Sequence, residues 1–262
     1  MTVLSEFNEL IDVVKKLRSP EGCPWDREQT LESLTPHIIE EAYELVDAIQ
    51  TGVTTDIQEE IGDVLLHVVM LSNMAEEDGH FSLLNVIQTI TEKMIRRHPH
   101  VFGDVEVNSV DEVWKNWEAI KKQEKSGSIF TSIPASLPAL MQAEKIQKKA
   151  SRVGFDWDDK IKPFEKVKEE VAEIGEVLAQ PNPDIKELEE EIGDALFAIV
   201  NVARKWDIDP EAALRAGNTK FKRRFAEMET VADQNGTPMS QLSLDELNEL
   251  WEQAKLSKPL VN

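Results

Sequence analysis

Cysteine is nearly missing from this chain, which has one, Cys23, among 262 residues. A single cysteine excludes an intrachain disulfide and a zinc site built from cysteines, and it fits a reducing compartment. Long apolar runs are missing too, since the longest, 64–74, is interrupted by His67 and is too short to cross a bilayer. The first residues turn acidic at once and lack the profile of a signal peptide. We therefore expect a cytoplasmic protein with no membrane partner.

Basic residues are scarce relative to acids, with 29 Lys and Arg against 50 Asp and Glu and a net charge of −21. Such a surface repels nucleic acid and anionic membranes, so we expect no nucleic-acid partner. A nucleotide is also an anion and can approach only where metal ions or local bases offset the field. The hydrophobic fraction of 41% is ordinary, so the abundance of charge does not predict disorder.

Segments of alternating polarity, which predict strands, are absent as well, and apolar residues recur at helical spacing instead. Thr35-Pro36 and the capping boxes that begin at Ser109 and Ser243 mark helix starts. In the third expected helix, residues 61–71 are apolar nearly all round and should form the buried centre of a bundle. The sequence therefore predicts an all-α fold. Helices are expected at about 3–18, 35–52, 56–77, 82–97, 109–125, 137–151, 163–179, 184–206, 210–232 and 243–256.

The chain repeats itself, with matched residues in unchanged order and spaced 127 to 134 residues apart. This predicts two tandem helical-bundle domains, 1–125 and 139–262, joined by a linker at 126–138. The matched pairs are Gly22/Gly154, Trp25/Trp157, Asp26/Asp158, Glu41/Glu170, Glu44/Glu173, Glu60/Glu191, Asp63/Asp194, Lys93/Lys220, Arg97/Arg224, Trp117/Trp251 and Lys121/Lys255.

Each half carries the acidic pattern Glu-Glu-x-x-Glu followed by Glu-x-x-Asp. At about 100° per residue, two acids of each string lie on one shoulder of an apolar helix stripe, so two antiparallel helices packed on their stripes bring four acids together. The four acids are Glu41, Glu44, Glu60 and Asp63 in the first half and Glu170, Glu173, Glu191 and Asp194 in the second. The stripes are Ile38, Ala42, Leu45 and Ile49 with Ile57, Ile61, Val64 and Val68, and Val167, Val171, Ile174 and Leu178 with Leu188, Ile192, Ala195 and Ile199.

Clustered carboxylates suit magnesium, which takes oxygen ligands and completes its shell with phosphate and water. Asp63 and Asp194 stand in mostly apolar runs, so we expect them to be buried and coordinated. Gly62 and Gly193, in mid-helix, predict a close approach to the backbone. A solvated acidic face is the ordinary explanation in so acidic a chain, but its repetition at matched positions favours a metal site.

Basic and aromatic residues complete the pattern. Lys220 and Arg224, one turn apart on a helix, suit the oxygens of a phosphate, although bases also decorate ordinary helix surfaces. Trp251 and Trp117 are either platforms for stacking a nucleobase or core anchors.

The most specific strings are Gly22-Cys23-Pro24-Trp25-Asp26, the two acid motifs, Arg96-Arg97-His98-Pro99-His100-Val101-Phe102-Gly103 and Val153-Gly154-Phe155-Asp156-Trp157. Together these motifs, spread over essentially the whole chain, resemble the MazG-type nucleoside triphosphate pyrophosphohydrolases in their two-domain bacterial form. The resemblance implies tandem all-α domains, a homodimer, and hydrolysis of a broad range of nucleoside triphosphates to monophosphate and pyrophosphate, a house-cleaning of nucleotide pools. It implies magnesium as cofactor, with two or more ions per site and manganese able to substitute.

By the same resemblance, the C-terminal repeat carries the main site. Its catalytic residues are Glu170, Glu173, Glu191 and Asp194, which are the metal ligands, with Lys220 and Arg224. Residues matching nucleotide-binding positions are Lys166, Glu187, Leu188, Glu189, Glu190, Asp194, Lys220, Arg224 and Trp251. Glu41, Glu44, Glu60 and Asp63 form a second-tier metal site in the N-terminal repeat. We expect Glu170 to serve also as general base toward water.

Two alternatives stay open at this point. One is a non-catalytic acidic helical module that binds or regulates a partner. The other is a pyrophosphatase specific for dCTP or phosphoribosyl-ATP on the same scaffold.

Overall fold

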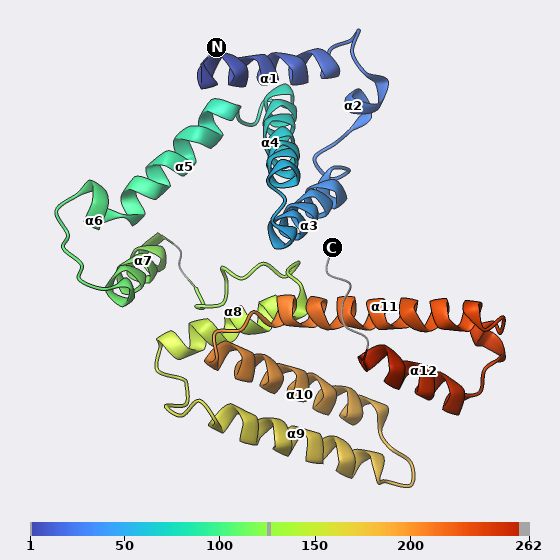
Figure 1. Cartoon of the computed structure of the whole chain (residues 1–262). Helices are drawn as coiled ribbons and strands as arrows, with labels where there is room; N and C mark the ends of the chain where they lie inside the picture. Colours follow the sequence, from blue (N-terminus) through green and yellow to red (C-terminus); the bar gives the residue numbers. More distant parts are fainter. Residues whose placement is uncertain (1, 125–126, 257–262) are drawn as a thin grey trace. The chain divides into compact units, whose positions relative to one another are not determined.

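The computed structural model describes residues 2–124 and 127–256, apart from the side chains of residues 111, 122 and 123. The chain divides into two compact units, Met1–Lys125 and Ser126–Asn262 (Figure 1). Across the described residues every regular element is a helix, which confirms the all-α prediction. None of the helices among these residues combines the length and the apolar character needed to cross a membrane.

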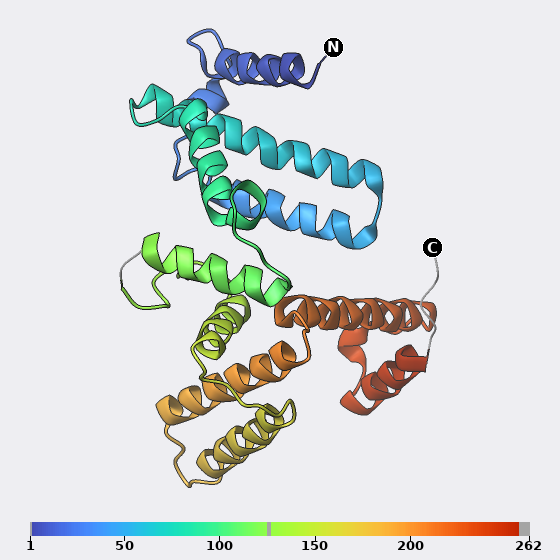
Figure 2. The same cartoon turned by 90° about the vertical axis from the view of Figure 1, so that its left-hand side faces the viewer.

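The first unit is built around an antiparallel helix hairpin, α3 and α4, which lie side by side in both views (Figures 1 and 2). Val14 of α1, Leu34 before α3, and Val69, Met70 and Met74 of α4 form its buried core. The core therefore sits at the C-terminal half of α4, away from the acids. Its helices are α1 (Val3–Arg18), α2 (Pro24–Glu28), α3 (Thr35–Thr51), α4 (Thr54–Glu77), α5 (Leu83–Arg97), α6 (Pro99–Phe102) and α7 (Val110–Glu124).

The second unit repeats the hairpin with α9 and α10. Helix α8 packs against α10 and α11, and α12 packs against α11 (Figure 2). Small buried residues such as Ala195, Ala198 and Ala232 let these helices approach closely. The helices are α8 (Ala139–Arg152), α9 (Lys162–Leu178), α10 (Ile185–Lys205), α11 (Pro210–Gln234) and α12 (Leu244–Leu256), with a 3-10 turn at Met239–Gln241.

Helix starts follow the predicted capping signals. The amide of Glu112 donates to Ser109 Oγ at 3.2 Å, and the amide of Ser243 donates to Glu246 Oε2 at 2.8 Å. The short helices α2 and α6 were not predicted, because four or five residues are too few to show an amphipathic period.

The predicted packing of the hairpins is wrong in one respect. Several stripe residues are exposed rather than packed, among them Ile61 (52%), Val171 (55%) and Ile192 (44%), whereas Glu170 is only 4% exposed. Residues 61–71 are accordingly buried only toward their C-terminal end. The two helices of a hairpin meet along a line shifted toward the acids, because the contact face is set by the partner helix and not by apolar periodicity alone. Within the described residues of each unit, an apolar face of the hairpin is left uncovered.

An ion pair in the first unit fixes the loop that carries the Trp-Asp motif. Arg18, at the end of α1, pairs with Glu77 at the end of α4, with 2.7 Å between Nη2 and Oε2. Its Nη1 also donates to the backbone carbonyls of Asp26 and Gln29. The loop is thereby held against the far end of the hairpin.

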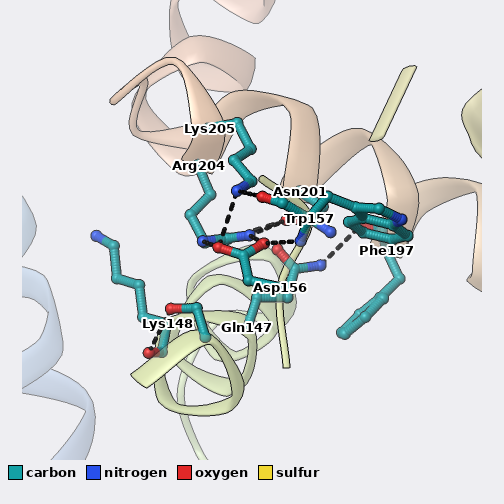
Figure 3. Close-up of polar contacts among 9 residues, drawn as sticks. Gln147, Lys148, Asp156, Trp157, Phe197, Asn201, Arg204 and Lys205 are labelled. Atoms are coloured by element: carbon teal, nitrogen blue, oxygen red, sulfur yellow. Dashed lines mark hydrogen bonds and ion pairs between the residues drawn. The ribbon is translucent and has the colours of Figure 1, made fainter. Parts of the chain in front are cut away.

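The second unit makes the same connection with the charges reversed (Figure 3). Asp156, on the loop, accepts from Arg204 at 2.7 Å and pairs with Lys205 at 2.9 Å, both from the end of α10. Burial alone would raise the pKa of Asp156, but the hydrogen bonds from Arg204 and Lys205 lower it to about 2. Lys205 also donates to the backbone carbonyl of Trp157.

Candidate metal and nucleotide site

The hairpin of the second unit gathers acids from both of its helices. Glu170 of α9 and Glu191 and Asp194 of α10 each offer a carboxylate oxygen, and these atoms lie within 4.8 Å of one another. A hydrogen bond with Glu170 raises the pKa of Glu173, and burial and the charges of Glu170 and Glu191 add to the effect. Glu173, the fourth predicted acid, therefore lies close enough to Glu170 and Glu191 for their charges to raise its pKa.

Lys166 supplies the only ion pair that the structure gives Glu170 among the described residues. Its Nζ lies 2.6 Å from Glu170 and 2.7 Å from Glu169. Hydrogen bonds to Glu169 and Glu170 raise the pKa of Lys166. One lysine offsets only part of the charge of the cluster, so further positive charge would be stabilising there.

The first unit holds a matching cluster. Glu41 of α3 and Glu60 and Asp63 of α4 place oxygens within 4.8 Å of one another. Burial, followed by the charges of Glu44, Asp63 and Glu41, raises the pKa of Glu60. Glu60 Oε2 is buried and has no hydrogen-bond partner in the described part of the chain. His67 Nε2 lies 3.7 Å from Glu41.

Both clusters fit a hard divalent cation. All of their donors are carboxylate oxygens, the ligands that magnesium and manganese prefer. The orphaned Glu60 Oε2 and the raised pKa of Glu173 are what an array of acids shows when its charge is only partly compensated.

The burial expected for Asp194 is wrong: Asp194 is exposed, and Asp63 is half-buried. Gly62 and Gly193 also have open space where a Cβ would stand, so the predicted close approach is not made by any of the described residues. Both glycines instead lie on helices whose apolar faces are uncovered, so a contact with another molecule can still involve them.

The predicted phosphate and base residues form a group of their own. Arg224 of α11 lies over the ring of Trp251 of α12, with its guanidinium carbon 5.6 Å from the ring centroid. The ring of Phe221 packs against the same indole, with 5.1 Å between the ring centroids. Arg224 Nε is buried and has no hydrogen-bond partner in the part of the chain that the structure describes, and Lys220 is exposed. Within the described residues, neither Lys220 nor Arg224 forms an ion pair or hydrogen bond with the acids.

The corresponding group of the first unit carries an acid that the sequence did not reveal. Arg97 lies 5.3 Å from the centroid of Trp117, as Arg224 does over Trp251. Glu124 pairs with both Arg96 and Arg97, and their hydrogen bonds lower the pKa of Glu124 to about 2. Glu124 has no partner in the repeat pattern, which is why the sequence did not single it out.

The remaining predicted nucleotide residues lie in the first turns of α10. Glu187 accepts a 3.4 Å hydrogen bond from Gln180, and Leu188 is half-buried. Glu189 and Glu190 are exposed. The first turn of α10 thus lies next to the loop that joins α9 and α10, and its acids are open to solvent.

A family model described as MazG nucleotide pyrophosphohydrolase domain matches residues 29–102 and 162–228. The chain belongs to the MazG family. Each match covers one acid-bearing hairpin, so the MazG domain occurs once in each unit.

Relatives match over nearly the whole chain. A Thermotoga maritima protein named nucleoside triphosphate pyrophosphohydrolase/pyrophosphatase MazG is 48% identical over 252 residues, which is 95% of each chain. An Escherichia coli nucleoside triphosphate pyrophosphohydrolase is 42% identical over 257 residues, 96% of this chain and 98% of that one. The crystal structure of a mazG-related protein from Thermotoga maritima matches 44% of this chain and 98% of its own, with 29% identity and a TM-score of 0.39.

Proposed function

We propose that this chain hydrolyses nucleoside triphosphates to nucleoside monophosphate and pyrophosphate, using divalent metal at the acid cluster of α9 and α10. The observation that carries the proposal is the convergence of Glu170, Glu191 and Asp194 within a MazG domain. Two relatives that share more than two-fifths of their residues with the chain over nearly its whole length are named for this activity.

Each residue has a defined part in the proposed reaction. Glu170, Glu173, Glu191 and Asp194 would hold magnesium, or manganese in its place, which would supply positive charge to the phosphates and lower the pKa of a bound water. Glu170 accepts the proton of the attacking water. Lys166 releases Glu170 and turns to the phosphates, which replace the carboxylate as its counter-charge.

Lys220, Arg224 and Trp251 bind the other parts of the nucleotide. The two bases hold the oxygens of the leaving pyrophosphate, and the indole face of Trp251 stacks on the nucleobase without reading its identity. This stacking is consistent with a broad substrate range and with a house-cleaning role in nucleotide pools.

The working form is a cytoplasmic homodimer. The uncovered apolar faces of the hairpins support this, because residues such as Ile61, Val171 and Ile192 would be shielded from water by a second copy. Burying such faces stabilises by about 25 cal/mol per Å² of apolar surface.

A product assay tests the proposal. Purified full-length protein is incubated with canonical and altered nucleoside triphosphates plus magnesium, and pyrophosphate and orthophosphate are measured separately. Metal-dependent pyrophosphate from many nucleotides is the expected result. No pyrophosphate from any nucleotide would overturn the proposal, and release from one nucleotide alone would favour a substrate-specific pyrophosphatase.

A further inference from the structure

A cavity of about 190 Å³ opens beside the acid cluster of the first unit. Its polar wall is formed by Trp25, Asp26, His37, Glu41, Asp63 and His67, and leucine and methionine side chains line the rest. Since a water molecule takes up roughly 30 Å³ of liquid, the volume matches about six waters, the scale of one heterocyclic ring system. Glu41 and Asp63 belong to both the cavity and the acid cluster, so the two are continuous.

Asp26 is the unexplained group in this cavity. The residue is only 8% exposed, and among the described residues its carboxylate forms no hydrogen bond or ion pair. Arg18 donates to the backbone carbonyl of Asp26 and not to its carboxylate in the described structure. The carboxylate oxygens of Asp26 still reach solvent, and the residue lines the cavity, so hydrogen-bond donors from a ligand can take the place of water at this point.

The second repeat shows that loop structure does not require this burial. Asp158, which matches Asp26, is exposed, and the loop there is held by Asp156. In the first unit, Arg18 and Glu77 hold the loop instead, and Asp26 lines the cavity.

Aromatic rings border the same cavity. Trp25 and His37 meet edge to face with ring centroids 6.0 Å apart, and Trp25 is 54% exposed. An exposed indole face at the mouth of a polar cavity is a stacking surface for a planar heterocycle. His67 Nδ1 is buried, has no hydrogen-bond partner among residues 2–124 and 127–256, and provides a further polar group in the cavity lining.

We propose that this cavity binds the base of a nucleotide and that Asp26 selects bases with two adjacent N–H donors, as guanine has. The phosphates would then lie toward Glu41 and Asp63, the acids that would hold a metal ion. This inference rests on the proposed nucleotide chemistry of the chain and extends it, because it assigns the first unit a base-reading site of its own, whereas Trp251 only stacks.

The selectivity follows from the hydrogen-bonding capacity of a carboxylate. An ionised Asp offers two acceptor oxygens and no donor. Guanine satisfies both oxygens with its ring N–H and its amino group, whereas hypoxanthine lacks the amino group and offers only the ring N–H. Adenine sets a ring acceptor beside its amino group, so one oxygen would face a lone pair. Sites of this kind reject the analogue that leaves a buried polar group unpaired.

The test uses the full-length chain carrying Glu191→Gln, which disables the acid cluster of the second unit. Binding of the α,β-methylene analogues of GTP and ITP, which resist hydrolysis, is measured by calorimetry with magnesium. We expect the GTP analogue to bind about tenfold tighter than the ITP analogue, the effect of one hydrogen bond to a charged group. Adding Asp26→Asn should weaken the GTP analogue about tenfold and bring the two affinities together.

Asp158→Asn is the matched control and should leave both affinities unchanged. A purely structural role for Asp26 would lower the melting temperature and weaken both analogues equally, so an unchanged GTP-to-ITP ratio in Asp26→Asn overturns the inference. Equal binding of both analogues before the substitution, or no binding by the Glu191→Gln chain, overturns it as well. In each of these cases pyrophosphate release by the unsubstituted chain would still stand, so failure of the inference is distinguishable from failure of the proposed function.

Discussion

The two units hold their Trp-Asp loops in the same place with opposite arrangements of charge. In the first unit, Arg18 at the end of α1 bonds to the loop backbone and pairs with Glu77 at the end of the hairpin. In the second, Asp156 comes from the loop and Arg204 and Lys205 come from the end of the hairpin. Both units therefore tie the loop to the end of the hairpin with an ion pair, whichever side carries the positive charge. The exchange also changes which loop side chains remain available for a ligand.

The acid clusters differ in the cation that faces them. Lys166 pairs with Glu170 at 2.6 Å in the second unit. The residue at the matching distance before Glu41 is His37, which instead lies 3.6 Å from Glu40, while His67 lies 3.7 Å from Glu41. The second cluster therefore has a permanent positive charge beside it, and the first has histidines that are charged only when protonated.

The largest expected difference between the units is in activity. Asp194→Asn should reduce pyrophosphate release by roughly a hundredfold, because it removes a metal ligand from the main site. Asp63→Asn, the matched substitution, should cost less. Both are measured on full-length protein with a broadly accepted nucleotide, and equal losses would show that the two repeats share catalysis evenly.

The next largest effect concerns the ion pairs of Asp156 with Arg204 and Lys205, which tie the Trp-Asp loop of the second unit to α10. Asp156→Asn should lower the unfolding free energy at pH 7 by about 1 kcal/mol, after allowing for solvent screening of the ion pairs. Because the pKa of Asp156 falls from 3.8 to about 2 on folding, its contribution is complete above about pH 4 and is lost as pH falls toward 2. Urea unfolding at pH 7 and at pH 2.5 measures it.

Asp158→Asn, which alters an exposed acid of the same loop, serves as the control. It should leave the free energy of unfolding unchanged at both pH 7 and pH 2.5. A loss in Asp156→Asn that is equally large at both pH values would mean that the ion pairs are not its source.

The smallest expected effect separates the two local cations. Lys166→Met should lower the melting temperature of metal-free protein by a few degrees and have less effect in saturating magnesium, since metal then supplies the charge that the lysine provided. His37→Met in the first unit should change neither temperature noticeably. Thermal unfolding with chelator and with magnesium checks this, and an equal loss in both conditions would count against a compensating role for Lys166.

Local sequence rules predicted the helices, the duplication and the acids that converge, because capping residues and helical spacing act over a few residues. Helical spacing predicted that Glu170 and Asp194 would meet, and they do, although the apolar stripes on which the helices were expected to pack are partly exposed. The burial of Asp26 and the exposure of Ile61 and Val171 could not be predicted this way, since both depend on how separate helices pack. The pairing of Glu124 with two arginines was missed for the same reason.

The most direct test of the central claim is a manganese titration followed by electron paramagnetic resonance, with pyrophosphate release measured on the same samples. The full-length chain is compared with a Glu191→Gln, Asp194→Asn double variant. The account predicts that the double variant binds fewer manganese ions and loses most pyrophosphate release. Unchanged manganese binding with unchanged release would contradict the assignment of the α9–α10 acids as the metal centre.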